Sequence, residues 1–132
     1  MKPNARVGCL ALFCLLLTPV VLADTPAATE TEVNYLLDAV ATSNCAFRRN
    51  GTWYDGKKAA AHLRLKYQYL KSRNLVRTTD DFIERGATRS SFTGREYTIG
   101  CAGSADVPAA QWLRSLRARY HPQQPVPVTP TR

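Results

Sequence analysis

Only two cysteines, Cys45 and Cys101, remain in the part of this chain that we expect to fold. The other two lie in residues 1–23, which have the pattern of a removable export signal. Export delivers a protein to an oxidising compartment, where two cysteines without other thiol partners are expected to pair. In the chain-entropy model, closing a loop of this length stabilises the folded chain by roughly 4 kcal/mol. We therefore predict one disulfide that joins two distant segments.

The export signal has the usual three parts. Lys2 and Arg6 form its positive start, and residues 7–22 are nearly all apolar. Val21 and Ala23 are the small residues that a signal peptidase recognises, which places cleavage after Ala23. The apolar run of about 16 residues is shorter than the roughly 20 of a membrane-spanning helix. An uncleaved anchor is the alternative, but we expect a mature chain without a membrane span, in the periplasm or outside the cell.

The net charge indicates the class of partner, and the length indicates the number of domains. The chain carries a formal net charge of +8, of which Lys2 and Arg6 contribute two. An exported basic chain meets anionic lipid headgroups, polysaccharides and acidic proteins rather than nucleic acid, although a charged surface can also serve solubility alone. We expect residues 24–121 to form a single domain with an adequate core. Residues 122–132 are rich in proline and are predicted to be a disordered tail.

Four segments have the pattern of helices. In the first, Val33, Leu36, Leu37 and Val40 recur at i, i+3, i+4 and i+7, which predicts a buried stripe. Cap residues set the expected limits of each helix. The predicted helices are 29–43 with a cap at Thr29 or Thr31, 55–73 with a cap at Asp55, 78–86 from Thr78 or Thr79 to Gly86, and 106–120 opening with Asp106 and Pro108.

The predicted helix 55–73 is apolar on two sides. One face carries Ala59, Leu63, Tyr67 and Leu70, and a well-separated face carries His62, Leu65 and Tyr69. Such a helix is either sandwiched within the fold or presents a patch to a partner.

Each of the two cysteines lies in a segment that has the pattern of a short strand. Residues 45–49 form a strand ending at an Asn50-Gly51 turn, and residues 96–101 alternate as a strand does. If these strands pair antiparallel with Cys45 opposite Cys101, then Phe47 faces Ile99 and Arg49 faces Tyr97 on one sheet face. Trp53 and Tyr54 either form a return strand or fill the core. The expected fold is α+β, with about four helices packed around a small antiparallel sheet and one disulfide.

Several phrases, taken in order, resemble the YfeK-like family of small bacterial periplasmic proteins of unknown function. They are Asn34-Tyr35-Leu36-Leu37, Phe47-x-Arg49-Asn50-Gly51, Ala61-His62-Leu63-Arg64-Leu65-Lys66, Asp81-Phe82-Ile83-x-Arg85 and Ser90-Ser91-x-x-Gly94-x-x-Tyr97. The resemblance spans roughly residues 31–116. It implies a bacterial exported single domain with no assigned activity, and it supplies no catalytic residues to transfer.

The first functional hypothesis concerns His62, which could bind an anion or activate a serine nucleophile. His62 lies four residues before Lys66, so the two share a helix face and could bind an anion, or His62 could act as a general base. Ser90 or Ser91 could join His62 and Asp80 or Asp81 in a Ser–His–acid arrangement. No Gly-x-Ser-x-Gly elbow supports it, and serine hydroxyls in a polar turn over 90–94 more often cap that turn. His62 likewise has a plain structural alternative as a buried hydrogen-bonding residue.

The second functional hypothesis is a cationic patch that binds an anionic group. Arg48, Arg49 and Arg95 would gather near the paired strands, with Lys66 from the helix. Together with Asn50 and Tyr54 they would suit a phosphate, carboxylate or sulfate group. A solvated strand face is the alternative.

The leading prediction is a non-enzymatic exported module that binds an anionic or protein partner in the envelope; a small hydrolase using Ser90 or Ser91 with His62 is the alternative. A structural envelope protein acting by contact alone is a third possibility. The sequence contains no closely spaced metal ligands, Cys-x-x-Cys pair, phosphate loop or dinucleotide fingerprint, so we expect neither metal nor cofactor. The candidate ligand-binding residues are Arg49, Asn50, His62, Lys66, Ser90, Ser91, Arg95 and Tyr97.

Overall fold

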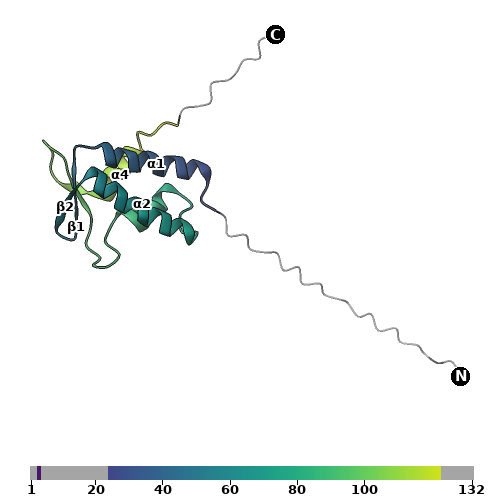
Figure 1. Ribbon diagram of the computed structural model, residues 1–132. Coiled ribbons are helices and arrows are strands. Elements are labelled where there is room, and N and C mark those ends of the chain that lie inside the picture. The colour runs from purple at the N-terminus through teal and green to yellow at the C-terminus, as the bar shows by residue number, and fades with distance from the viewer. Residues whose placement is uncertain (1–2, 4–23, 123–132) are drawn as a thin grey trace, which may run out of the picture.

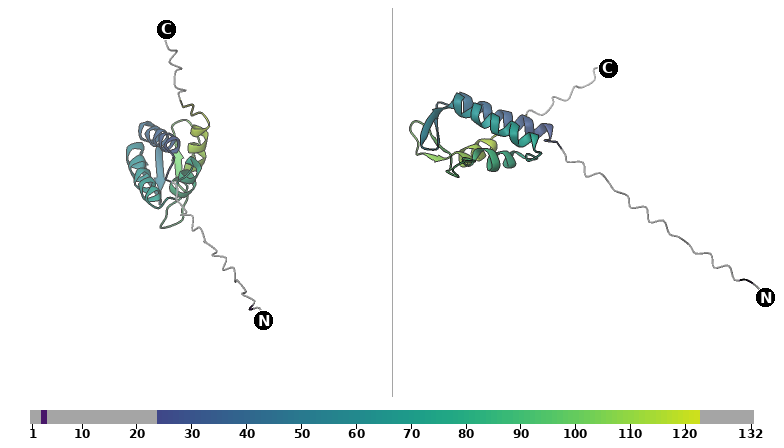
Figure 2. Two further views of the ribbon diagram at one scale, coloured as in Figure 1. Left: turned by 90° about the vertical axis from the view of Figure 1, so that its right-hand side faces the viewer. Right: turned by 60° about the horizontal axis from the view of Figure 1, so that its bottom comes forward.

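The structure, a computed structural model, describes residue 3 and residues 24–122. Apart from residue 3, the predicted export signal lies outside this described part, and so does the predicted tail except for its first residue. Two long helices, α1 (Ala27–Thr42) and α2 (Gly56–Ser72), lie alongside each other. Viewed down their length, helices surround the central strands (Figures 1 and 2). No helix among the described residues is long and apolar enough to cross a bilayer.

Helix α1 buries the predicted apolar stripe. Val33, Leu36, Leu37 and Val40 are all fully buried and join one hydrophobic cluster. The predicted threonine cap is wrong, because the helix begins at Ala27 after Pro26 without a side-chain cap. Thr29 and Thr31 instead lie inside the first turns, where their hydroxyls donate to the carbonyls of Arg77 and Ala27, both at 3.0 Å.

Helix α2 starts where predicted, because the Asp55 carboxylate accepts a hydrogen bond from the Lys58 amide at 2.8 Å. Its buried face contains Leu63, Tyr67 and Leu70, with Ala60 in place of Ala59, which is only half-buried. On the second apolar face Leu65 and Tyr69 stay exposed, at 67% and 58% of their surface. That face is therefore at the surface rather than sandwiched within the fold.

A hairpin joins β1 (Ala46–Arg49) to β2 (Thr52–Asp55). Asn50 and Gly51 connect the strands with φ values of 50° and 84°, the left-handed pair that a two-residue hairpin turn requires. Of the two alternatives for residues 53 and 54, the return strand is the one that forms. Trp53 remains 43% exposed and does not fill the core.

The sheet has the order β2-β1-β3-β4, and every pairing is antiparallel. β3 is Thr98–Gly100 and β4 is Val107–Pro108. Phe47 pairs with Ile99 as predicted, and both are buried. The predicted Cys45–Cys101 disulfide is present directly beyond the ends of these paired strands. The α+β prediction with one disulfide is thus confirmed.

The limits of the last two predicted helices differ from prediction. The helix that begins with α3 (Thr79–Phe82) does not end at Gly86; it continues as a π-helical turn, η1 (Ile83–Ala87). A Cβ at Gly86 would lie 3.1 Å from the Phe82 ring, so this glycine permits close packing rather than ending the helix. The last helix, α4 (Ala109–Arg117), begins later than Asp106 because the preceding Val107 and Pro108 pair with β3, and it ends at Arg117 rather than at residue 120.

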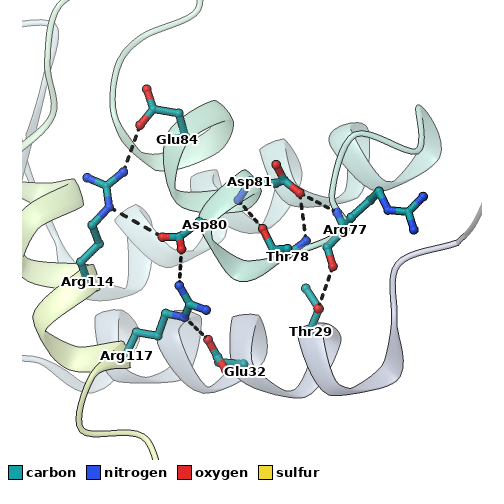
Figure 3. Close-up of polar contacts among 9 residues, drawn as sticks. All are labelled: Thr29, Glu32, Arg77, Thr78, Asp80, Asp81, Glu84, Arg114 and Arg117. Atoms are coloured by element: carbon teal, nitrogen blue, oxygen red, sulfur yellow. Dashed lines mark hydrogen bonds and ion pairs between the residues drawn. The ribbon is translucent and has the colours of Figure 1, made fainter.

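Charged side chains connect three helices on the face shown in Figure 3. Arg117 of α4 pairs with Glu32 of α1 and with Asp80 of α3. Arg114 pairs with Asp80 at 3.7 Å and with Glu84 of η1 at 3.0 Å. This network fixes α4 against both α1 and the α3–η1 segment.

Candidate functional site

Seven of the eight residues predicted from the sequence line one surface hollow of about 340 Å³. They come from the end of β1 and its turn, from one face of α2, and from the segment that leads into β3. Pairing of β1 with β3 sets Arg49 near Tyr97, and helix α2 places His62 and Lys66 one turn apart beside them. The hollow is lined by Arg49, Asn50, Tyr54, His62, Lys66, Ser90, Ser91, Phe92 and Tyr97.

Tyr97 is the fixed centre of the hollow. Its backbone is held on both sides, since its amide donates to the Thr88 carbonyl at 2.9 Å and its carbonyl accepts from the Ala109 amide at 2.8 Å. Its Oη lies 3.2 Å from His62 Nε2 and accepts a hydrogen bond from Lys66 Nζ at 3.3 Å. Lys66 can only donate, so the tyrosine hydroxyl hydrogen is free to point at His62 Nε2. This arrangement favours a neutral His62 with its hydrogen on Nδ1.

Lys66 is held by three contacts. Its Nζ also donates to the Arg89 carbonyl at 2.9 Å and lies 5.0 Å from the centre of the Tyr97 ring. An ammonium has three hydrogens, and two of them are used by Arg89 and Tyr97. One donor therefore remains for a ligand in the hollow.

The electrostatics of the hollow follow from partial burial of several basic groups. Burial, and then the positive charges of Arg49 and Lys66, lower the pKa of His62. Burial and the Arg49 charge also lower the pKa of Lys66. Burial raises the pKa of Tyr97, and Arg49 opposes that rise. Partial burial and neighbouring positive charge thus disfavour the protonated forms of His62 and Lys66.

Among the residues that the structure describes, no carboxylate offsets this charge, because neither Asp nor Glu lines the hollow. Within residues 24–122, none of the ion pairs includes Arg49 or Lys66. Arg49 instead lies with its guanidinium 4.8 Å from the centre of the Tyr54 ring. An anion entering the hollow would meet basic groups without competition from a side-chain acid.

Ser90 has a different role from the one that the hydrolase hypothesis needs. Ser90 is buried, and its Oγ accepts hydrogen bonds from the amides of Phe92 and Thr93, both at 3.3 Å. It therefore closes the polar turn, as the structural alternative predicted. No hydrogen bond joins either predicted serine to His62 in the described part of the chain, and His62 Nε2 faces Tyr97.

The acids proposed for that hydrolase are also engaged elsewhere. Asp81 accepts from the amides of Arg77 and Thr78 at 3.0 and 2.9 Å, completing a capping box. Asp80 belongs to the network with Arg114 and Arg117 (Figure 3). Nothing in this geometry orients His62 as a general base for a serine.

Arg95 does not join the other predicted residues. It lines a separate hollow of about 250 Å³ with Arg48, Asn50 and Glu96 among its neighbours. Arg48 is exposed and lies 5.9 Å from the Trp53 ring centre. The four-residue cationic patch expected from the sequence is therefore reduced to Arg49 and Lys66, which line the hollow together with His62.

Beneath the hollow lies a smaller space that the sequence did not indicate, which we name the apolar recess. It has a volume of about 40 Å³ and shares Arg49, Tyr54, His62 and Tyr97 with the hollow. The sequence offered one signal for a further basic residue at this site: Lys58, His62 and Lys66 are spaced four apart on one helix face. Apart from Arg48 and Lys58, the other residues that line the recess are apolar: Phe47, Ala59, Leu63, Ala87, Ala109 and Leu113.

A further groove adjoins the hollow. It has a volume of about 300 Å³, shares His62, Lys66 and Ser91 with the hollow, and includes the exposed Leu65 and Tyr69. Phe92, in the polar turn, is 99% exposed at the rim of the hollow. Basic and exposed apolar side chains thus meet on one surface. Among the described residues, no group of three or more His, Cys, Asp or Glu is placed to hold a metal ion.

Comparison with known proteins places this geometry in a family. The family described as "Family of unknown function (DUF5329)" matches residues 27–121, which include every residue of the hollow and the recess. The chain belongs to this family.

A curated protein similar to this chain is "Uncharacterized protein YfeK" of Salmonella typhimurium, strain LT2. It is 38% identical over 88 residues, which cover 66% of this chain and 72% of that protein. The YfeK-like resemblance drawn from the sequence is confirmed. No solved structure matches the chain. Because neither the DUF5329 description nor the relative's name states an activity, function has to be argued from the hollow itself.

Proposed function

We propose that this protein is exported and binds an anionic group of an envelope component in the hollow around Tyr97. The observation that carries the proposal is the gathering of Arg49, His62 and Lys66 on one half-buried surface without a carboxylate. A guanidinium and an ammonium together give both geometric and charge recognition of an oxyanion. Asn50 and Ser91 supply further polar groups at the rim.

Lowered pKa values support a binding role. Bringing positive groups together in a partly desolvated place costs free energy in the empty protein, and a bound anion relieves that cost. His62 and Lys66 both show this effect, with burial as its largest cause and Arg49 contributing to each. The arrangement is therefore more stable with an anion than without one.

The decisive experiment titrates the mature chain with acetate, phosphate and sulfate while two-dimensional amide NMR spectra are recorded. Chloride keeps the ionic strength constant, because exposed charges respond to salt alone. We expect saturable shifts at Arg49, Lys66 and Tyr97, and their loss in Arg49→Ala. Arg77→Ala is the matched control, since it removes an equal charge from an exposed position outside the hollow, where the guanidinium points away from its neighbours in Figure 3. Identical shifts in both variants, or none in the unaltered protein, would contradict the proposal.

Export is tested separately from binding. Cell fractionation should place the protein outside the cytoplasm, and its mass should match a chain that begins at Asp24. A full-length chain recovered from the cytoplasm would contradict export without affecting the anion site.

A further inference from the structure

The hollow and the apolar recess adjoin each other and differ in chemistry. Four side chains line both spaces, so the basic surface and the recess meet at them: Arg49, Tyr54, His62 and Tyr97. A group bound by the basic side chains at this shared boundary would direct its next atoms either outward or into the recess. The recess thus adds a selection that charge alone does not provide.

The recess suits a small apolar group. Leu63, Ala87, Ala109 and Leu113 are buried members of its lining, and their side chains offer no hydrogen bond. Its volume of about 40 Å³ is several times the roughly 10–15 Å³ that one water requires. Water placed there would lack polar partners on the apolar side, whereas a short hydrocarbon group would gain dispersion contacts and lose contact with water.

The donors at and next to this boundary fit a carboxylate better than a phosphate: Arg49 lines both spaces, and Lys66 contacts the shared Tyr97. Lys66 has one hydrogen left after its bonds to Arg89 and Tyr97, and the Arg49 guanidinium provides a planar fork. These match the two oxygens and single charge of a carboxylate. A phosphate monoester would bring three terminal oxygens and about two charges into a half-buried place, where unmatched oxygens are costly.

We infer that the ligand is a carboxylate whose adjoining carbon carries a small apolar group, with the carboxylate at Arg49 and Lys66 and the apolar group in the recess. The inference rests on the proposed anion-binding function and names its substrate class. A free short-chain acid and the C-terminal residue of a peptide share this chemistry. The larger outer hollow, with Asn50 and Ser91 at its rim, leaves room for a peptide chain to continue outward.

The test compares isobutyrate with acetate, because they share a carboxylate and differ by two methyl groups. We expect isobutyrate to bind the mature protein roughly tenfold more tightly, as burial of two such groups predicts. Ala59→Leu should fill the recess from its half-buried place on α2 and remove that preference while acetate still binds. Ala61→Leu adds the same atoms to an exposed position on the same helix and should leave the preference intact. Thermal unfolding of both variants verifies that each is folded.

Two further probes distinguish the sources of the carboxylate. N-acetyl-Ala-Ala binding more tightly than isobutyrate would support a peptide C-terminus, and equal or weaker binding would support a free acid. The C-terminal amide of that dipeptide should bind neither the mature protein nor Ala61→Leu. Binding of the amide as tightly as the acid would overturn the inference.

The remaining outcomes separate this inference from the proposed function. Acetate and isobutyrate binding equally would overturn the role of the recess and leave anion binding in place. A preference for isobutyrate that persists in a folded Ala59→Leu would do the same. Absence of binding by acetate, phosphate and sulfate would instead overturn the proposed function on which the inference rests.

Discussion

Nε2 of His62 lies 3.2 Å from the hydroxyl oxygen of Tyr97, and the positively charged Arg49 and Lys66 line the same hollow as this pair. The tyrosine hydroxyl can donate a hydrogen bond to a neutral imidazole, and it carries no negative charge that would stabilise an imidazolium. Burial and the two neighbouring cations act in the same direction, so the pKa of His62 is lowered. Protonation of His62 is thus the step at which pH acts on the empty site.

The stability of the unliganded protein should rise with pH across the range just below the ordinary histidine pKa of about 6.5. In that range the unfolded chain binds more protons at His62 than the folded chain does, so acid favours unfolding. The contribution is absent above about pH 6.5 and grows until pH falls below the lowered folded pKa. Urea unfolding at pH 7.5 and 5.5, compared with His62→Gln, measures it. A pH dependence that is unchanged in His62→Gln would contradict the assignment.

Anion affinity should change with pH in the opposite direction. A bound carboxylate stabilises the imidazolium and raises the pKa of His62, so binding takes up a proton. Affinity should therefore increase several-fold as pH falls from 7.5 to 5.5, where carboxylates remain ionised. Calorimetry in buffers of different ionisation enthalpy measures the proton uptake directly. His62→Gln should bind with little proton uptake, and unchanged uptake would contradict the role of His62.

Gly56 is required by close packing at the start of α2. A Cβ at this position would lie 2.3 Å from the Val40 carbonyl oxygen, which is backbone and cannot rotate away. We expect Gly56→Ala to lower the free energy of unfolding by about 2 kcal/mol, because α1 and α2 must separate to accept it. The adjacent Lys57→Ala is the control and should change it by less than about 0.5 kcal/mol. Equal effects of the two substitutions in urea unfolding would show that the contact is relieved at little cost.

The disulfide should stabilise the fold without defining the register. Replacing both Cys45 and Cys101 with serine should lower the free energy of unfolding by about 4 kcal/mol in the chain-entropy model. The Phe47–Ile99 pair is buried and should keep β1 and β3 aligned in the variant. Urea unfolding gives the loss, and amide cross-peaks between the two strands report the register. A loss near zero would show that the reduced unfolded chain is already compact.

The sequence predicted those features that depend on local spacing or on a single covalent link. Four-residue spacing placed His62 and Lys66 on one helix face, and the expected Cys45–Cys101 pair allowed us to infer the register that brings Tyr97 near Arg49. The predicted position of Arg95 depended on the path of the turn over 90–94, which its polar composition does not determine. That arginine consequently lies in another hollow.

Other features depend on contacts between distant segments and had no local signal. A glycine such as Gly86 commonly marks the end of a helix, yet here it allows Phe82 to pack closely against the backbone. The threonine at position 29 resembles a cap, but its hydroxyl bonds to a carbonyl 48 residues away. The apolar recess combines Leu63 of α2 with Ala87 of η1 and Leu113 of α4. Periodicity predicts that each is buried but not that their packing leaves a space.

The ion-pair network in Figure 3 provides a last prediction, on how α4 is held. Arg117 bridges Glu32 and Asp80 from two other helices, and both partners raise its pKa by hydrogen bonding. A single surface ion pair contributes little to stability, because ordering its side chains costs entropy. A guanidinium that is shared between two carboxylates loses that side-chain entropy once for two pairs. A double-mutant cycle of Glu32→Gln and Arg117→Gln should give a coupling free energy of about 1 kcal/mol that decreases in high salt. The exposed pair of Arg64 and Asp38, whose atoms lie 3.5 Å apart, is the matched control and should couple by less than about 0.5 kcal/mol. Equal coupling in the two pairs would mean that Arg117 acts as an ordinary surface residue and that apolar packing of Leu113 alone positions α4.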